Sequence, residues 1–339
     1  MPEHFVITDA FQGQLGTEAC PEPAEGELLC RPLCIGLCGT DRLVFAGEMP
    51  AAVFPRIPGH EVVGLVLKNN SNLALAPGTA ICVDPYKNCG TCHACKSGRP
   101  NCCRSNKTLG VQRDGIMRER FVVAADRVHV VPQEKDVRRY ALAEPLTLAL
   151  HVADRAGDVK GKWCLVAGVG NVGSMVVRVL KEHGARIIAW SISDISLTTA
   201  AKLGAELCVR ASDPDAEARV MEATGGEGVS VAIECAGKSS VVETCVRLAA
   251  FAGRVVLVGH SKQVSGIKGS DIVFKELDVL GSRNSHGCFE TAINWLAKDA
   301  DKWNSVISHR YDWPDALSAF HLTASAKGEY SKIVINFPD

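Results

Sequence analysis

Short apolar runs separated by glycine, proline, asparagine and aspartate characterise the first 130 or so residues. These runs are rich in valine, leucine and isoleucine, and they lie at 26–39, 60–70, 77–85 and 119–132. Short strands bounded by such turn residues predict a compact antiparallel barrel or sandwich. Residues 85–108 interrupt the pattern, because they are polar, rich in glycine and cysteine, and offer almost nothing apolar to bury. That segment needs another source of stability.

From about residue 140 the pattern changes to alternating helices and strands. Helices are expected over 141–157, 171–184, 197–206 and 241–253, and strands over 162–170, 185–191, 206–211, 229–237, 254–260 and 277–284. This alternation predicts a parallel, doubly wound sheet. The remainder predicts one helix over 288–303 and a short strand over 332–337. The sequence therefore predicts an α/β protein with a first domain over 1–146, a second over 147–285, and a tail over 286–339 that returns to the first.

Composition and charge narrow the class of protein further. The chain has 339 residues, 47% hydrophobic and 22% charged, with a net charge of −1. A neutral balance gives no sign of a nucleic-acid surface, and no apolar run approaches the ~20 residues of a membrane helix. The start lacks the basic and apolar segments of a secretory signal. With fifteen cysteines, an odd number, a reducing cytoplasm fits better than a disulfide framework, and neither nucleic acid nor membrane is expected as a partner.

The stretch VAGVGNVG at 166–173 carries a glycine fingerprint. Gly168, Gly170 and Gly173 follow the G-x-G-x-x-G spacing, with an apolar strand before them and an amphipathic helix after them. In this context the glycines allow a tight turn, a close approach of the pyrophosphate, and close packing of helix on strand. The sequence predicts a dinucleotide site that also includes Asn171 and Val172.

The second strand of this fold normally ends in an acid that binds the adenosine ribose. Here the strand ends at Ser191, and the following turn contains Asp194 but no basic residue. Asp194 is a candidate for the ribose hydroxyls, and Arg210, after the third strand, for a 2′-phosphate. The missing acid tilts the prediction towards NADP, with NAD left open.

Four cysteines in the polar segment follow the spacing C-x2-C-x2-C-x7-C: Cys89, Cys92, Cys95 and Cys103. Four thiolates at this spacing predict a tetrahedral structural zinc, which supplies the stability that apolar burial does not. Cys102 competes with Cys103 for the fourth position, and Cys103 is preferred. The ferredoxin spacing of an iron–sulfur cluster is not matched.

A second, scattered set has the composition of a catalytic zinc site. Cys38 lies in CGTD, His60 and Glu61 in PGHE, and Glu144 in AEP. One cysteine, one histidine and one carboxylate leave a fourth position for water or substrate. The sequence therefore predicts two zinc ions per chain.

These motifs together resemble one family. PGHEVVG, CGTD, the four-cysteine segment, AEP before a helix, GVGNVG and the closing KIVI strand are similar to those of the zinc-dependent medium-chain alcohol dehydrogenases. The branch they resemble is that of the polyol, sugar-acid and threonine dehydrogenases. The resemblance spans essentially the whole chain and implies a GroES-like β-barrel catalytic domain plus a Rossmann domain.

The resemblance also implies roles for the scattered set. Cys38 and His60 are expected to bind the catalytic zinc, with Glu61 or Glu144 as the third protein ligand. Asp41 matches the family's acid that orients the ligating histidine.

Further residues receive roles by the same resemblance. Thr40 is expected to contact the substrate oxygen, and Gly259 and Asn284 are expected to join the cofactor-binding residues. Arg283, in GSRNS, is a candidate partner for a substrate carboxylate or phosphate. The family's relay histidine, five residues after the zinc cysteine, is replaced by Leu43, so a carboxylate, the cofactor ribose or water must carry the proton.

The expected activity is hydride transfer between NAD(P) and a secondary alcohol or ketone of a polyol, sugar acid or similar small polar substrate. An NADPH-dependent biosynthetic ketone reductase is the alternative, favoured by Ser191. A non-catalytic relative is disfavoured by the intact Cys38, His60 and Glu144. The resemblance implies a homodimer or homotetramer.

Overall fold

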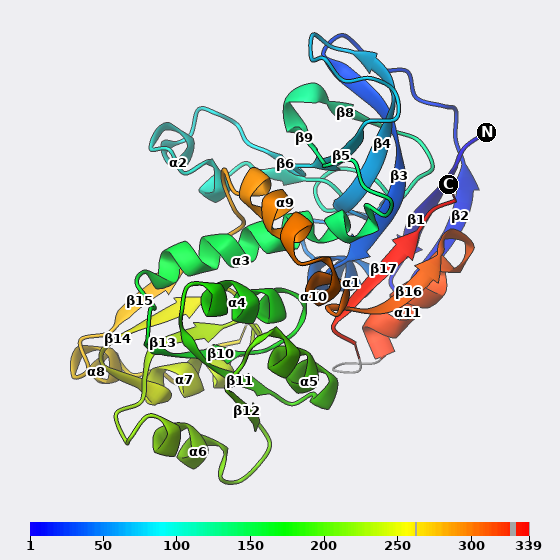
Figure 1. Ribbon diagram of the computed structural model, residues 1–339. Helices are drawn as coiled ribbons and strands as arrows, with labels where there is room; N and C mark the ends of the chain where they lie inside the picture. The colour runs from blue at the N-terminus through cyan, green and yellow to red at the C-terminus, as the bar shows by residue number, and fades with distance from the viewer. Residues whose placement is uncertain (262, 326–329, 339) are drawn as a thin grey trace. The chain divides into compact units, whose positions relative to one another are not determined.

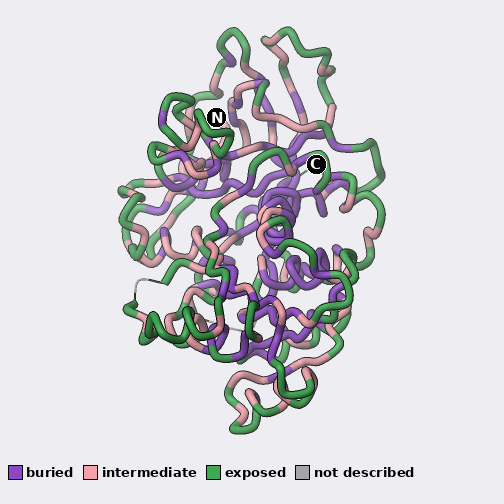
Figure 2. The backbone as a smooth tube through the Cα atoms, turned by 90° about the vertical axis from the view of Figure 1, so that its left-hand side faces the viewer, coloured by how far each residue is buried: buried purple, intermediate pink, exposed green. Residues whose placement is uncertain are grey.

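The computed structural model describes residues 1–261, 263–325 and 330–338 (Figure 1). The chain divides into two compact units. The first contains Met1–Thr147 and most of the chain from His286 onward, and the second contains Leu148–Ser285. Each unit is built around its own sheet, and the buried stretches in Figure 2 follow the strands and the helices packed on them.

The sheet of the first unit is mixed. Its strand order is β16-β17-β3-β4-β5-β9, with β8 also paired to β3, and every pairing is antiparallel except β16 with β17. The strands are β3 (Glu27–Leu37), β4 (Glu61–Asn70), β5 (Ala80–Val83), β8 (Phe121–Ala124), β9 (Val128–Val130), β16 (Ile307–Asp312) and β17 (Lys332–Asn336). The last strand of the chain, β17, thus lies directly beside β3.

Two hairpins and several short helices complete the first unit. The hairpins are β1 (Glu3–Asp9) with β2 (Gln12–Thr17), and β6 (Tyr86–Lys87) with β7 (Lys107–Thr108). The helices are α1 (Gly39–Phe45), α2 (His93–Lys96), α9 (Phe289–Lys298), α10 (Ala300–Asn304) and α11 (Ala316–Ser325), with 3₁₀ turns η1 (Pro100–Cys102), η2 (Ala125–Arg127), η3 (Arg138–Leu142) and η4 (Trp313–Asp315). Phe320 of α11 stacks on Phe5 of β1 at 5.0 Å and lies 5.3 Å from Phe45 of α1. This aromatic cluster ties the chain's two ends together.

The second unit is a doubly wound parallel sheet in the order β12-β11-β10-β13-β14-β15. Its strands are β10 (Trp163–Ala167), β11 (Arg186–Ser191), β12 (Leu207–Arg210), β13 (Val229–Glu234), β14 (Ala249–Leu257) and β15 (Asp278–Gly281). Its helices are α4 (Asn171–Glu182), α5 (Asp194–Leu203), α6 (Ala216–Ala223), α7 (Ser239–Leu248) and α8 (Gly269–Val273), while α3 (Ala143–Ala156) leads in from the first unit. The order reverses between β10 and β13, and ligands of such sheets bind at the carboxyl ends of the strands at this point.

The structure confirms the predicted fold class and corrects several element boundaries. The helix predicted over 241–253 ends at Leu248, because the backbone from Ala249 is already extended and pairs with Val229 of β13. The helix predicted over 288–303 is divided at Asp299 into α9 and α10, and the tail also contains β16 and α11. In the part of the chain that the structure describes, no helix is both long and apolar enough to cross a membrane.

Candidate metal and cofactor sites

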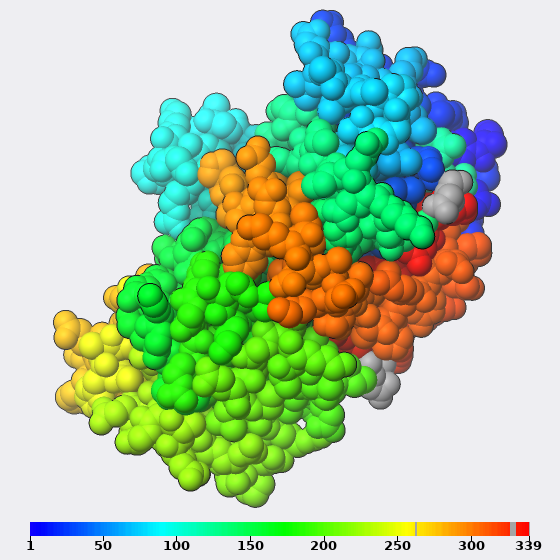
Figure 3. Space-filling view, viewed as in Figure 1, coloured from blue at the N-terminus to red at the C-terminus, as the bar shows by residue number. Residues whose placement is uncertain are grey.

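The cysteine lobe (residues 85–108) brings four thiols together at the surface of the first unit, where it appears in cyan in Figure 3. The ligand atoms of Cys89, Cys92, Cys95 and Cys103 all lie within 4.8 Å of one another. The Sγ atoms of Cys92 and Cys95, and those of Cys89 and Cys103, are 3.5 Å apart. Zinc–sulfur bonds of ~2.3 Å give a tetrahedral edge of roughly 3.8 Å, so the cluster fits zinc. Cys102 lies outside the group found among the described residues.

Backbone N–H groups aim at the lobe's sulfur atoms. The Cys92 N–H donates to Cys89 Sγ at 3.4 Å, and the Cys89 N–H donates to Cys103 Sγ at 3.3 Å. Hydrogen bonds from Thr91 and Cys92 lower the pKa of Cys89 to about 5. Hydrogen bonds also lower the pKa of Cys92, whereas burial raises the pKa of Cys95 to about 12. The lobe therefore favours the thiolate, the species that binds zinc, at Cys89 and Cys92.

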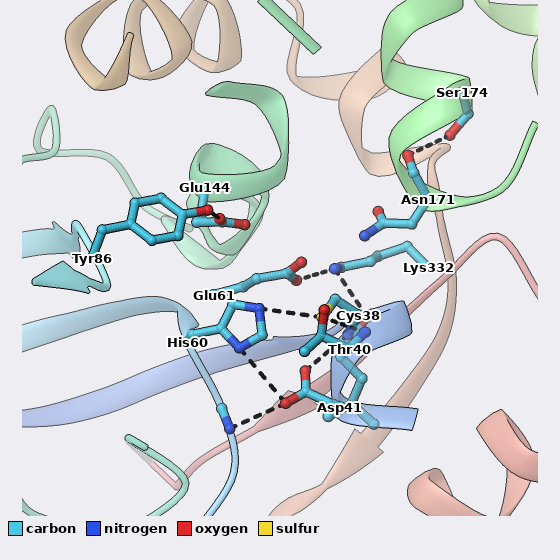
Figure 4. A network of polar contacts seen from close by, with 12 residues as sticks. Cys38, Thr40, Asp41, His60, Glu61, Tyr86, Glu144, Asn171, Ser174 and Lys332 are labelled. Atoms are coloured by element: carbon cyan, nitrogen blue, oxygen red, sulfur yellow. Dashed lines mark hydrogen bonds and ion pairs between the residues drawn. The ribbon is translucent and has the colours of Figure 1, made fainter. Parts of the chain in front are cut away.

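Cys38 is placed by the start of a helix. It is the N-cap of α1, and its Sγ accepts the Thr40 N–H at 3.1 Å. In return, Asp41 Oδ2 accepts the Cys38 N–H at 3.0 Å, which completes a capping box. The cap points the sulfur towards His60, whose Nε2 lies 3.2 Å away (Figure 4).

Asp41 joins the two segments that carry these candidate ligands. Its buried carboxylate also accepts the Gly59 N–H at 3.3 Å and lies 3.7 Å from His60 Nδ1. Gly59 has a φ of +94°, a conformation that favours glycine and turns the chain so that His60 faces Cys38. A carboxylate behind one ring nitrogen, with the other free to face a metal, is the usual arrangement of a zinc-binding histidine.

Glu61 is occupied by an ion pair that the sequence pattern did not suggest. Its carboxylate pairs with the ammonium group of Lys332, and that ammonium also donates to the Leu37 carbonyl at 3.0 Å. Both side chains are essentially fully buried, at 1% and 0% exposure. Gly36 leaves room for the pair, because a Cβ there would lie 2.3 Å from Glu61 Oε2 and within 2.9 Å of Lys332.

Glu144 reaches the same place from the first turn of α3, where the helix N-terminus favours a negative charge. A carboxylate oxygen lies within 4.8 Å of a His60 ring nitrogen and of a Glu61 carboxylate oxygen. Burial and the charge of Glu61 raise the pKa of Glu144 to about 7, against the opposing effect of His60. The Tyr86 hydroxyl donates to Glu144 Oε1, and burial followed by the charge of Glu144 raises the pKa of Tyr86 well above its usual value.

The charges of this site call for a cation. Three buried carboxylates, those of Asp41, Glu61 and Glu144, lie around one lysine and one histidine. The half-buried Cys38 thiol lies beside them, and burial followed by the charge of Asp41 raises its pKa. Burial alone would lower the pKa of His60, yet Cys38 and Asp41 raise it well above its usual value. A divalent ion among these donors would supply the missing positive charge. Half-buried Thr40 and Leu43 lie on α1 beside this set.

The glycine loop of the second unit has the geometry of its fingerprint. Gly168, after β10, has a φ of +96°, and a Cβ there would lie 2.5 Å from the Ala236 nitrogen. A Cβ at Gly173 would lie 2.1 Å from the Gly168 carbonyl oxygen. Gly170, the N-cap of α4, has open space on its Cβ side and no side-chain cap. The first N–H groups of α4, including those of Asn171 and Val172, suit an anion such as a pyrophosphate.

At the end of β11 the structure brings the three predicted residues together. Ser191 is buried, and its Oγ accepts the Ser193 N–H at 3.2 Å. Arg210, opposite Ser191 in the register of β11 and β12, forms an ion pair with Asp194, the first residue of α5. An arginine and an aspartate therefore stand where the sheet normally presents one ribose-binding acid.

The carboxyl end of β13 holds a residue that sequence reasoning missed. Glu234 is fully buried, and its Oε1 accepts the N–H groups of Ala236 and Gly237 at 2.7 Å each. These bonds hold the turn that packs on Gly168 across the switch point. Gly259 fits against the same turn, because a Cβ there would lie 2.2 Å from the Gly237 nitrogen.

Asn284 and Arg283 follow β15. Asn284 adopts a φ of +48°, the left-handed conformation that asparagine tolerates. Arg283 is exposed. The structure keeps both on the segment that leaves the second sheet.

A nucleotide-binding sheet, a closed four-thiol cluster and an open Cys/His/carboxylate set define the class as zinc-dependent, NAD(P)-dependent dehydrogenases. Comparison with known families agrees. The alcohol dehydrogenase GroES-like domain matches residues 24–133, and the zinc-binding dehydrogenase family matches residues 171–298. The chain belongs to the zinc-type alcohol dehydrogenases, as the resemblance predicted.

Individual relatives point to the same branch. The chain is 34% identical to an uncharacterised zinc-type alcohol dehydrogenase-like protein of Haemophilus influenzae, over 85% of both chains. It is 29% identical to L-galactonate-5-dehydrogenase of Escherichia coli and 31% identical to L-threonine 3-dehydrogenase of Pyrococcus abyssi, over 94% of each chain in both cases.

Two solved structures are similar over 99% of both chains. The NADH complex of the rspB alcohol dehydrogenase from E. coli CFT073 is 29% identical, with a TM-score of 0.91. A zinc-binding dehydrogenase from Sinorhizobium meliloti bound to NADP is 30% identical, also with a TM-score of 0.91. The neighbours thus include complexes with each of the two nicotinamide cofactors.

Proposed function

We propose that the protein transfers a hydride between NAD(P) and a secondary alcohol or ketone of a sugar acid, polyol or similar small polar substrate. The observation that carries this proposal is that Cys38 and Glu144 both lie close to the buried His60, while Lys332 neutralises Glu61. The Cys38 sulfur is 3.2 Å from His60 Nε2, and a Glu144 carboxylate oxygen lies within 4.8 Å of a His60 ring nitrogen. The sugar-acid and threonine dehydrogenases among the relatives support the substrate class.

In this proposal Cys38, His60 and Glu144 hold a catalytic zinc ion, and the lobe cysteines hold a structural one. Bound zinc would supply Lewis acidity towards the substrate oxygen, and the nicotinamide would accept or return the hydride. Asp41 is proposed to fix the His60 ring, and Thr40 is proposed to hydrogen-bond the substrate oxygen. Since Leu43 replaces the relay histidine, the proton leaves through Glu61, Glu144, the cofactor ribose or water.

The purified wild-type protein tests the proposal directly. We expect two zinc ions per chain by atomic emission, and NAD(P)-dependent turnover of at least one member of a panel of polyols, sugar acids and 3-hydroxy amino acids. One zinc per chain, at the lobe, together with no turnover across the panel in either direction, would overturn the proposal and leave a non-catalytic relative.

For the cofactor we propose a preference for NADP, because Ser191 supplies no carboxylate to repel a 2′-phosphate and Arg210 lies opposite it. The same feature supports the reductase direction as a second candidate. Asp194 holds Arg210 in an ion pair, so it limits how strongly the guanidinium can bind a phosphate.

Asp194→Asn is therefore expected to strengthen NADPH binding about tenfold relative to NADH, since a hydrogen bond to a charged group contributes roughly 1.5–3 kcal/mol. Arg210→Gln should weaken NADPH binding and leave NADH binding unchanged. Titration of the cofactor fluorescence gives both dissociation constants. Equal ratios in the wild type and both variants would contradict the assignment of this pair.

The remaining proposals concern the substrate and the assembly. Exposed Arg283 is proposed to pair with a substrate carboxylate.

We also propose a homodimer or homotetramer, since β15, which pairs only with β14 in the described sheet, presents an open edge near the exposed Val273 (75%) and Phe274 (79%). No disulfide joins any two of the fifteen cysteines, all of which lie in the described residues, and we propose a reducing compartment such as the cytoplasm.

A further inference from the structure

Tyr86 is a buried phenol that points from the cysteine lobe to the candidate catalytic site. Tyr86 is 6% exposed, and Glu144, which accepts a hydrogen bond from the Tyr86 hydroxyl, is 4% exposed. Figure 4 shows the Tyr86 ring leaving its strand and ending at the Glu144 carboxylate. The hydrogen bond joins residues 58 positions apart in the sequence.

The backbone of Tyr86 is fixed at the neck of the lobe. Tyr86 pairs with Thr108 between β6 and β7, so both ends of the lobe pass through this short hairpin. The Tyr86 N–H donates to Asp84 Oδ1 at 3.0 Å, and Asp84 is in turn 3.3 Å from Arg127. Cys89, the first thiol of the lobe, follows three residues later. Closing the lobe on its metal therefore holds the strand from which the phenol projects.

The Glu144 carboxylate is held at one of its oxygen atoms and lies close to other candidate ligands. Oε1 accepts the Tyr86 hydroxyl, and the carboxyl group lies within 4.8 Å of His60 and Glu61. Carboxylates that bind metal are themselves oriented by hydrogen bonds, and losing such a bond weakens metal affinity by roughly 10–100-fold. Glu61 is also held by a buried partner, Lys332, but through an ion pair and not through a neutral hydroxyl group.

We propose that Tyr86 is a positioning residue that holds Glu144 in its metal-binding orientation and makes that orientation depend on the folded cysteine lobe. The inference rests on the proposed function, because it assumes a zinc ion at the catalytic site. It adds a connection between the two metal sites that runs through one hydroxyl group.

Tyr86→Phe removes the hydroxyl and keeps the ring. We expect this variant to bind the catalytic zinc roughly 10–100-fold more weakly, as is usual when a hydrogen bond that orients a metal ligand is lost. A chelator should then remove the catalytic zinc at a correspondingly lower concentration, while the lobe keeps its zinc. With Co²⁺ in the catalytic site, the visible absorption of the ion should shift in Tyr86→Phe, since the ligand field changes. Both readouts are independent of turnover.

Tyr140 offers a matched control in the same unit. It is also a fully buried tyrosine whose hydroxyl donates to a glutamate, at 2.6 Å from Glu134 Oε1, but that glutamate is not among the groups at the metal site. Tyr140→Phe should reduce stability and leave metal affinity and the cobalt spectrum unchanged. In a Glu144→Gln background, Tyr86→Phe should have no further effect on metal affinity.

The outcomes separate the two proposals. A wild-type protein with a single zinc ion, at the lobe, and no turnover across the panel would overturn the proposed function. Two zinc ions in the wild type, with equal chelator sensitivity and equal cobalt spectra in Tyr86→Phe and Tyr140→Phe, would overturn the role of Tyr86 and leave the function intact. An additive effect of Tyr86→Phe in the Glu144→Gln background would also overturn it.

Discussion

Replacing Cys103 by serine is expected to remove one of two zinc ions and to unfold the cysteine lobe, whereas the same change at Cys102 should leave both ions in place. Cys103 is fully buried, with its sulfur 3.5 Å from that of Cys89. The lobe has little apolar core, and structural zinc sites contribute about 10–16 kcal/mol of apparent binding free energy to such segments. A serine hydroxyl does not replace a thiolate at that site.

The measurement combines zinc content with limited trypsin digestion, because Lys96 and Arg104 lie inside the lobe. Cys103→Ser should show one zinc per chain and rapid cleavage there, while Cys102→Ser should resemble the wild type. Equal zinc loss in both variants would contradict the assignment of the fourth ligand. If Tyr86 positions Glu144 as inferred, the zinc that remains in Cys103→Ser should also be bound more weakly.

The parts of the site that could be predicted are those whose residues lie close together in the sequence. The four lobe cysteines span fifteen residues, and the glycine loop spans six, so spacing alone carries their geometry. The segment CGTD gives no signal of a helix start, because cysteine is not among the preferred N-cap residues. In the structure its sulfur accepts the Thr40 N–H and caps α1, so the same contact starts the helix and aims the thiol at His60.

The parts that could not be predicted depend on pairing across the fold. Lys332 reaches Glu61 over 271 positions, and the pairing of β17 and of β4 with opposite sides of β3 brings them together. The sequence left Glu61 and Glu144 as equal candidates for the zinc ligand, and the lysine is what distinguishes them. Helix α11 was missed for a similar reason, since its Phe320 is buried against Phe5 and Phe45 from the other end of the chain.

Lys332→Met is expected to lower the free energy of unfolding by about 3–5 kcal/mol, the usual effect of removing one partner of a buried ion pair. Methionine is similar in length and apolar, so the variant keeps most of the packing and removes the charge. Glu61, at 1% exposure, would then carry an uncompensated charge beside β3, and the Leu37 carbonyl would lose its donor. Urea-induced unfolding of the first unit, followed by circular dichroism, measures the loss.

The double variant Glu61→Gln/Lys332→Met decides whether charge is the cause. It removes both charges, so most of the lost stability should return, since replacing a whole buried pair by uncharged groups is often close to neutral. A double variant no more stable than Lys332→Met would show that the lysine acts through packing alone. The ion pair would then no longer explain why Glu61 does not bind the zinc ion, and Glu61 would again be as good a candidate for the zinc ligand as Glu144.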